Sequence, residues 1–249
     1  FSKYVYDCGL DFVTPSVGWC QAEPPYVGSE GVDLYRTTDG GRHWQRVSVT
    51  GPDADKPGSL PWGCDKDLEF TSPTTGWASF TCPKAAPLYE TANGGKTWVK
   101  RRVAAPPGGP VDSGSGFAGR PLVSGRRGAV GYTIDGSPLR SVVDVSTDRG
   151  RAWRPVTPPG APQGWAADAI SGTMWRLVAG DHILATDNAG RTWRTITSNV
   201  TFRVYYAYDD PTPPVVDFVT SQTGWIAGPS LWRTTNGGRT WHRLAVPGT

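Results

Sequence analysis

Short runs of alternating hydrophobic and polar residues follow one another along the whole chain, and turn-forming residues separate them. Near the end of the chain the runs are Val215–Val219, Gly224–Ala227, Leu231–Thr234 and Thr240–Val246. The breaks between them contain Ser, Thr, Gly, Pro and Asn, which is typical of turns between β-strands. The pattern therefore predicts groups of four short antiparallel strands, and an all-β fold.

One eight-residue motif recurs five times, with the consensus [Ser/Thr]-x-[Asp/Asn]-x-Gly-x-Thr-Trp, and it defines five repeats that we number in chain order. Its Asp or Asn is Asp39, Asn93, Asp148, Asn188 and Asn236, and its Trp is Trp44, Trp98, Trp153, Trp193 and Trp241. Asp and Asn replace one another freely, and an amide cannot act as a general base. We therefore interpret these residues as structural: the polar side chain closes a hairpin turn, and the Trp packs beside it.

A second motif lies upstream, where a Phe is followed by Gly-Trp. Phe12 leads to Gly18-Trp19, and Phe70 and Phe218 lead to equivalent pairs. In the third repeat Leu122 aligns with the Phe and Gly128-Ala129 with Gly-Trp, and in the fourth the residues are Ile170 and Arg176-Leu177. Four strands repeated every 40–55 residues are typical of a β-propeller blade. We predict one domain over residues 1–249 with five four-stranded antiparallel blades, near residues 8–49, 64–103, 117–157, 167–197 and 215–246.

Together the two motifs resemble the Asp-box, or bacterial neuraminidase repeat, over roughly residues 10–246. The arrangement is most similar to that of propellers related to photosystem II assembly and stability factors. Sialidases, sortilin-type receptors and xyloglucan-degrading glycosidases carry similar boxes. The resemblance implies a β-propeller with Asp-box hairpins, but because these families differ in activity it implies no single function.

The four cysteines form two pairs, and each pair brackets the first hairpin of a blade. We predict the disulfides Cys8–Cys20 and Cys64–Cys82, because antiparallel strands bring such positions within bonding reach. Four free thiols are the alternative. No CxxC or His pair accompanies the cysteines, so we expect no metal site. Two disulfides indicate an oxidising compartment, and the absence of an initiator Met suggests a removed signal or lipid anchor segment. We expect a secreted or cell-surface/periplasmic protein.

Composition excludes several classes of protein. The chain has 32 Gly and 23 Pro, only 19% charged residues and a net charge of +3. So much Gly and Pro argues against a helical bundle, and no apolar run is long enough for a membrane helix. Basic residues are scattered and not clustered, which argues against nucleic-acid binding. We expect a monomer without a cofactor.

The long segments that depart from the repeat are the candidate binding region. They are Ala22–Val32, Thr50–Asp67, Val103–Arg120, Thr157–Asp168 and Ser198–Pro214, and in a propeller they would share the face opposite the motif hairpins. Candidate ligand contacts within them are Trp62, Asp65, Trp165, Arg203, Tyr205, Tyr206 and Asp209. Such aromatics suit sugar stacking or a protein hot spot equally well. The structural alternative is that they fill the propeller channel or pack the loops.

We expect a secreted, non-enzymatic binding or assembly propeller that recognises a protein or a carbohydrate through this loop face. The alternative is a glycoside hydrolase of sialidase-like or xyloglucanase-like type, which needs two carboxylates about 5–10 Å apart. Asp67, Asp168 and Asp210 are the candidates for that role, because all three precede predicted inner strands. No other residue is assigned a catalytic part.

Overall fold

The computed structural model describes most of the chain. The described residues are 8–22, 31–51, 56–81, 87–103, 116–118, 122–124, 127–134, 140–156, 158–159, 166–171, 173–202, 205–207, 210–212 and 215–245. All of the regular elements in these ranges are β-strands joined by turns. The all-β prediction is therefore confirmed. Within the same ranges, no helix is long and apolar enough to cross a membrane.

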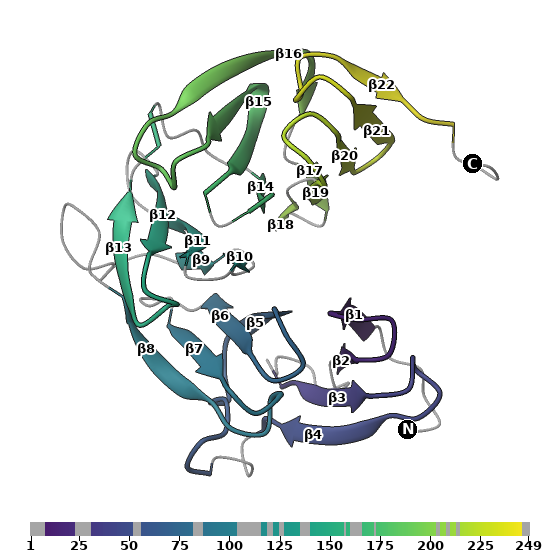
Figure 1. The fold of residues 1–249 in the computed structure, drawn as a ribbon, viewed down its shortest axis with the longest axis vertical. Coiled ribbons are helices and arrows are strands. Elements are labelled where there is room, and N and C mark those ends of the chain that lie inside the picture. Colours follow the sequence, from purple (N-terminus) through teal and green to yellow (C-terminus); the bar gives the residue numbers. More distant parts are fainter. Residues whose placement is uncertain are drawn as a thin grey trace. The chain divides into compact units, whose positions relative to one another are not determined.

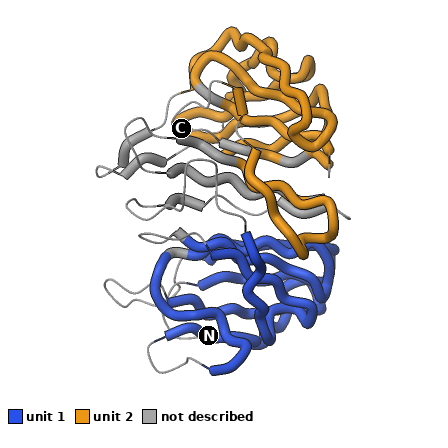
Figure 2. The backbone as a smooth tube through the Cα atoms, turned by 90° about the vertical axis from the view of Figure 1, so that its left-hand side faces the viewer, with its two compact units in different colours: residues 1–105, 109–121 blue, residues 106–108, 122–249 orange. Residues whose placement is uncertain are grey.

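The chain divides into two compact units, coloured separately in Figure 2. Unit 1 contains residues 1–105 and 109–121, and unit 2 contains residues 106–108 and 122–249. The prediction of a single domain over the whole chain stays a prediction.

Unit 1 holds the first two repeats, and each repeat forms four strands that pair antiparallel in chain order (Figure 1). The strands of the first are β1 (Cys8–Phe12), β2 (Gly18–Ala22), β3 (Asp33–Thr37) and β4 (Gln45–Val49); those of the second are β5 (Asp65–Phe70), β6 (Gly76–Thr81), β7 (Leu88–Thr91) and β8 (Val99–Val103), and β9 (Gly116–Ala118) follows. The register is the same in both, since Phe12 pairs with Gly18 and Phe70 with Gly76. The short strands and their turns follow the predicted pattern closely.

Unit 2 holds the other three repeats. The third consists of β10 (Leu122–Ser124), β11 (Arg127–Ile134), β12 (Arg140–Ser146) and β13 (Ala152–Val156); the fourth of β14 (Ala166–Ala169), β15 (Trp175–Thr186) and β16 (Arg194–Phe202); the fifth of β19 (Val215–Phe218), β20 (Gly224–Ala227), β21 (Leu231–Thr234) and β22 (Trp241–Arg243). A two-stranded hairpin, β17 (Tyr205–Ala207) with β18 (Asp210–Thr212), lies between the last two repeats in sequence.

The prediction of five four-stranded blades is wrong in number. Among the described residues, four repeats form four strands each, and the fourth repeat forms a three-stranded sheet. The sequence pattern requires a turn between the second and third strands of each repeat. In the fourth repeat only Gly180 and Asp181 are available for it, and the register shifts between Gly180 and His182. The chain passes this irregularity within a single strand, β15, which runs for 12 residues.

The Phe alignment of the third repeat was wrong by one residue, and so were both the Phe and the Gly-Trp alignments of the fourth. In the third repeat Val123, and not Leu122, pairs with Gly128. In the fourth, Ala169 pairs with Trp175, and the amide of Ala189 donates to Thr173 O at 2.9 Å as that of Gly40 does to Ser16 O. Ala169 therefore stands at the Phe position and Trp175 at the Gly position.

This exchange keeps the space at the strand pair filled. In the regular repeats the Phe ring lies directly over the Gly, where an added Cβ would come within 2.6 Å of Phe12 or Phe218 ring carbons. In the fourth repeat the large side chain, Trp175, is on the opposite strand, and its ring centroid lies 6.4 Å from that of Trp193. Phe70 lies at a similar 6.2 Å from Trp98. Each pair therefore combines one large aromatic side chain with one small residue, although both residues of the fourth repeat differ from those of the regular repeats.

The predicted disulfide Cys8–Cys20 is confirmed. It links β1 to β2 within the first repeat, with the two Cα atoms 5.6 Å apart. Cys64 is also disulfide-bonded. Its predicted partner, Cys82, lies outside the described residues. A disulfide is compatible with an extracellular location.

Candidate functional site

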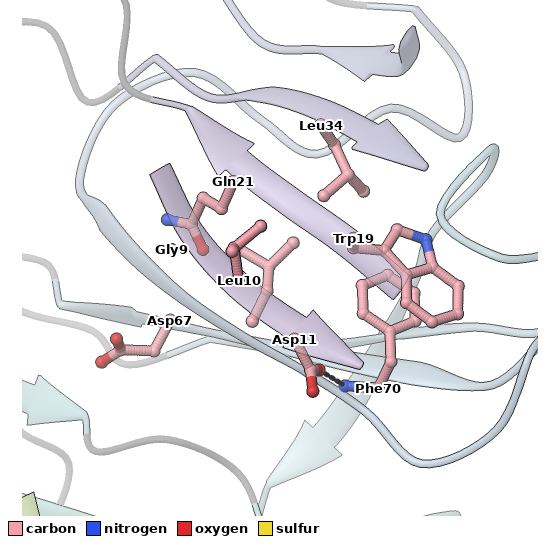
Figure 3. A pocket seen from close by; sticks show the side chains of 9 residues that line it. Gly9, Leu10, Asp11, Trp19, Gln21, Leu34, Asp67 and Phe70 are labelled. Carbon is pink, nitrogen blue, oxygen red and sulfur yellow. Dashed lines mark hydrogen bonds between the residues drawn. The ribbon is translucent and has the colours of Figure 1, made fainter. Parts of the chain in front are cut away.

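A small pocket lies within unit 1, where the first repeat meets the second (Figure 3). Its volume is about 200 Å³, and it is lined by residues of β1, β2, β3 and β5: Gly9, Leu10, Asp11, Trp19, Gln21, Leu34, Asp67, Leu68 and Phe70. Most of these side chains are apolar, and Gln21, Asp11 and Asp67 are the polar ones. The mixture is typical of small binding sites, where a few polar groups orient a ligand against an apolar wall.

The apolar wall is fixed by contacts between the two repeats. The rings of Trp19 and Phe70 stack face to face, with centroids 3.6 Å apart and an interplanar angle of 2°. The Trp19 indole N–H donates to the carbonyl oxygen of Gly94 at 3.1 Å. Both rings are almost completely buried. This wall is therefore rigid before any ligand arrives.

Two of the polar groups at the pocket already serve the fold. The amide N–H of Phe70 donates to Asp11 Oδ2 at 2.6 Å, as Figure 3 shows. The Gln21 side-chain amide donates to the carbonyl oxygen of Lys66 at 2.7 Å. Asp67 is the exposed carboxylate of the set.

The three carboxylates considered for a hydrolase occupy different surroundings. Asp67 belongs to unit 1, and Asp168 and Asp210 belong to unit 2. Asp168 Oδ2 accepts the amide N–H of Phe218 at 2.5 Å. This bond repeats the one between Asp11 and Phe70, since Asp168 and Asp11 each precede the residue at the Phe position of their repeat. Asp168 therefore ties neighbouring repeats together.

The predicted ligand residues are only partly described. Trp62 precedes β5 and is 45% exposed, and Asp65 is the first residue of that strand. Tyr205 and Tyr206 lie on β17, where they pair with Thr212 and Pro211, and Asp210 begins β18. This part of the predicted loop 198–214 is therefore a hairpin. Trp165, Arg203 and Asp209 lie outside the described residues.

The five motif hairpins share one set of hydrogen bonds. The side-chain oxygen of each Asp or Asn accepts the amide N–H four residues later at 2.9–3.0 Å, from His43, Thr97, Ala152, Thr192 and Thr240. Trp44, Trp98 and Trp153 donate their indole N–H to the carbonyl of the second Gly at 2.8–3.1 Å. Each polar residue is thus engaged within its own turn.

These bonds also affect ionisation. The His43 amide and imidazole beside Asp39 hold the pKa of that carboxyl well below its ordinary value. The Ala152 amide likewise lowers the pKa of Asp148. Both carboxylates stay ionised as turn acceptors, so neither is suited to act as a general acid.

Sequence reasoning missed two buried charged groups in unit 2. Asp144 is 3% exposed on β12, between Val143 and Val145, and burial raises its pKa to about 7. Arg176 is fully buried and donates to the carbonyl of Trp175 at 2.9 Å and to Asp187 Oδ1 at 3.3 Å. Desolvation lowers the pKa of Arg176. An acid inside a run of valines was the available signal for Asp144.

Among the residues that the structure describes, no group of three or more His, Cys, Asp or Glu side chains could hold a metal ion. The pocket lining combines apolar side chains with the polar residues Asp11, Gln21 and Asp67.

Comparison with known proteins assigns the fold class, which is the β-propeller. No protein-family profile matches the chain, and no curated protein sequence is significantly similar to it. Three solved propeller structures align over nearly the whole chain at low identity. A low identity of this kind establishes the fold alone.

The GH74 enzyme of Niastella koreensis is 14% identical, with a TM-score of 0.59, over 94% of this chain and 37% of that one. YCF48 from Cyanidioschyzon merolae is 15% identical, with a TM-score of 0.54, over 96% of this chain and 84% of that one. A Trypanosoma rangeli sialidase is 14% identical, with a TM-score of 0.56, over 93% of this chain and 46% of the sialidase chain. The chain therefore spans less than half the length of the two hydrolases.

Proposed function

We propose that the protein is a secreted, non-enzymatic binding propeller that uses the pocket of unit 1 and the Trp62 loop, which precedes β5 in the chain, to hold a protein or glycan ligand. The observation that carries this proposal is the pocket itself, with its rigid aromatic wall and one exposed carboxylate, Asp67. The exposed Trp62 lies three residues before the strand that carries Asp67. Stacking on an exposed indole is a mode of contact that both sugars and protein side chains use.

The size of the pocket supports binding of one anchor group. Sites that enclose a whole small-molecule ligand have volumes of about 300–1,000 Å³. At about 200 Å³ the pocket holds a smaller group, such as one side chain or one sugar substituent. The rest of the ligand would then lie across the surface around Trp62.

The hydrogen bonds that the carboxylates accept from the backbone support a binding function and not hydrolysis. A retaining or inverting glycosidase needs a pair of acids on either side of the scissile bond, about 5–10 Å apart. Of the three candidate acids, Asp168 accepts the backbone N–H of Phe218 in a neighbouring repeat. Asp11, which lines the pocket but was not a candidate, accepts that of Phe70 in the same way. An acid that orders the backbone in this way is poorly placed to take up and release a proton during turnover.

We also propose that the five motif hairpins are Asp-box hairpins, with Asp39, Asn93, Asp148, Asn188 and Asn236 as their turn residues. Their shared hydrogen bonds support a structural role. The second Gly of every motif, for example Gly95 with φ +91°, adopts a backbone conformation that favours glycine. The first Gly position has positive φ as well but holds Arg149 or Ala189 in two repeats.

The test is a binding screen of the whole protein against a glycan array and an immobilised peptide library, with hydrolysis followed on the same glycans. For any ligand found, Trp62→Ala and Asp67→Ala should each weaken binding at least about tenfold while the melting temperature stays unchanged. Val99→Ala is the matched control, because Val99 is 55% exposed on β8 and does not line the pocket.

A glycan that is hydrolysed by the wild-type protein, with turnover lost in Asp67→Asn, would establish the hydrolase alternative. Binding that is unaffected by changes at both Trp62 and Asp67 would show that the ligand lies elsewhere.

A further inference from the structure

The charged side chains that line the pocket of unit 1 are carboxylates. Asp11 belongs to β1 and Asp67 to β5, two strands that lie side by side in Figure 3. Among the described residues that line the pocket there is no Lys, Arg or His. A carboxylate oxygen accepts hydrogen bonds and donates none, and it accepts most strongly from a cation. The lining therefore favours a ligand group that is positively charged and rich in N–H donors.

The side-chain donors of the lining already donate to backbone carbonyls of the second repeat. Gln21 Nε2 donates to Lys66 O at 2.7 Å, and the Trp19 indole N–H donates to Gly94 O at 3.1 Å. The bond to Lys66 O orients the Gln21 amide, whose oxygen is a further acceptor at the pocket. A carboxylate or a phosphate would be repelled by two acids here, so an anionic ligand group is disfavoured.

Lys66, the basic residue next to Asp67 on β5, has surroundings of its own. Its ammonium donates to Gly63 O at 3.1 Å and to Cys64 O at 2.8 Å, and it lies 5.0 Å from the Phe80 ring centroid. Lys66 is buried and does not line the pocket. The carboxylate of Asp67 and the cation beside it in the chain thus belong to different sites.

The apolar part of the lining suits a long side chain better than a sugar ring. Trp19 and Phe70 are 1% and 3% exposed and stack on each other with centroids 3.6 Å apart, so neither offers an open ring face to a sugar. Leu10, Leu34 and Leu68 supply the remaining apolar surface. Arginine and lysine have apolar stems that pack along such a surface and a cationic head that donates hydrogen bonds.

We propose that the pocket receives one basic side chain, of arginine or lysine, from a partner protein; this inference rests on the binding function proposed for the pocket. The stem lies against the leucines, and the cationic head donates to the acceptor oxygens of Asp67, Asp11 and Gln21. The pocket volume of about 200 Å³ suits a single side chain. Charge complementarity of this kind determines which partners are accepted more than how tightly they are held.

The experiment compares two small probes of the same shape, N-acetyl-arginine amide and N-acetyl-citrulline amide, in which a neutral urea replaces the guanidinium. Each is titrated into the isotope-labelled whole protein, and NMR follows the indole signal of Trp19 and the side-chain amide signal of Gln21. The arginine probe should bind at least about tenfold more tightly, because only its donors are charged. Added salt should weaken binding of the arginine probe and leave that of the citrulline probe unchanged.

Three variants locate the preference. Asp67→Asn should bring the ratio of the two affinities close to one. Asp181→Asn is the matched control, because it removes the same charge from a side chain of unit 2 that is 70% exposed, and the ratio should stay as in the wild type. Gly9→Leu should abolish binding of both probes: Gly9 lines the pocket, and a Cβ there has only the Gln21 backbone oxygen nearby, at 4.0 Å. Circular dichroism and melting temperature check that each variant folds.

Equal affinities of the two probes in the wild type would overturn the inference, and so would a preference that survives Asp67→Asn. Absence of arginine binding up to about 50 mM would overturn it as well, since a single anchoring group is expected to bind in the millimolar range. The binding function is judged separately. A glycan or peptide that is captured by the protein and lost in Trp62→Ala and Asp67→Ala would keep that function even if the basic occupant were wrong.

Discussion

The first and second repeats of unit 1 have the same local structure and very different surroundings. Both close their hairpins with the same hydrogen bonds, to Asp39 at 2.9 Å and to Asn93 at 2.9 Å. Yet Phe70 of the second repeat is 3% exposed, and Phe12 of the first is 42% exposed. The difference shows that the motif determines the turn, whereas burial depends on the neighbouring repeat.

The largest effect that tests this comparison is the loss of the two Phe rings. Phe70→Ala should destabilise the protein by about 3–5 kcal/mol, because it removes a buried ring stacked on Trp19. Phe12→Ala should cost roughly half as much or less, since its ring is already partly in water. Urea denaturation of the two variants measures both values. Equal losses would show that Phe12 is buried in solution.

A smaller effect should separate the second Gly residues of the two hairpins. Gly95 and Gly41 have almost the same φ, +91° and +88°, so Ala at either position has the same backbone strain, about 1–2 kcal/mol. A Cβ at Gly95 would also come within 2.6 Å of Leu34, whereas at Gly41 it would meet only Trp44, at 3.6 Å.

We therefore expect Gly95→Ala to be more destabilising than Gly41→Ala by about 1–3 kcal/mol, the usual cost of overpacking. Differential scanning calorimetry of the two variants gives the comparison. Equal melting temperatures would show that Leu34 moves aside freely.

The smallest effect concerns pH. The pKa of Asp39 is lowered in the folded protein, so its contribution to stability is present above the unfolded pKa, near 4, and is lost as pH falls through the folded pKa. Asn93 has no such proton to gain. The first hairpin should therefore open in acid before the second, as measured by amide exchange of His43 and Thr97 between pH 6 and pH 2.

Exchanging the two residues tests the cause of this difference. Asp39→Asn should remove the acid sensitivity of the first hairpin, and Asn93→Asp should confer it on the second. If the sensitivity stayed with the first hairpin in both variants, its source would be another group.

The fold was predictable wherever a residue pattern is enforced locally. The strands β19–β21 begin where the alternation of Val215, Gly224 and Leu231 predicted, because turn residues separate them. The fourth repeat was misaligned because its Phe position holds Ala169 and its Gly position holds Trp175. A pairing of this kind becomes visible only when the two strands are placed side by side.

The candidate site was less predictable than the fold. Trp62 and Asp67 stood out as departures from the repeat, but the pocket that Asp67 lines is made largely of repeat residues such as Trp19 and Phe70. Those residues looked purely structural in the sequence. Their second role follows from the packing of one repeat on the next, which the spacing along the chain does not specify.

The Ala169 and Trp175 pair has a consequence for how repeats of this kind diverge. From a Phe opposite a Gly, changing the Phe first leaves a hole, and changing the Gly first forces two rings into one space. Either order passes through a less stable ancestor, so the two substitutions are expected to be inherited together. Repeats with exchanged pairs should therefore be recognised by correlated changes at the two positions, where a search for the Phe and Gly-Trp motif overlooks them.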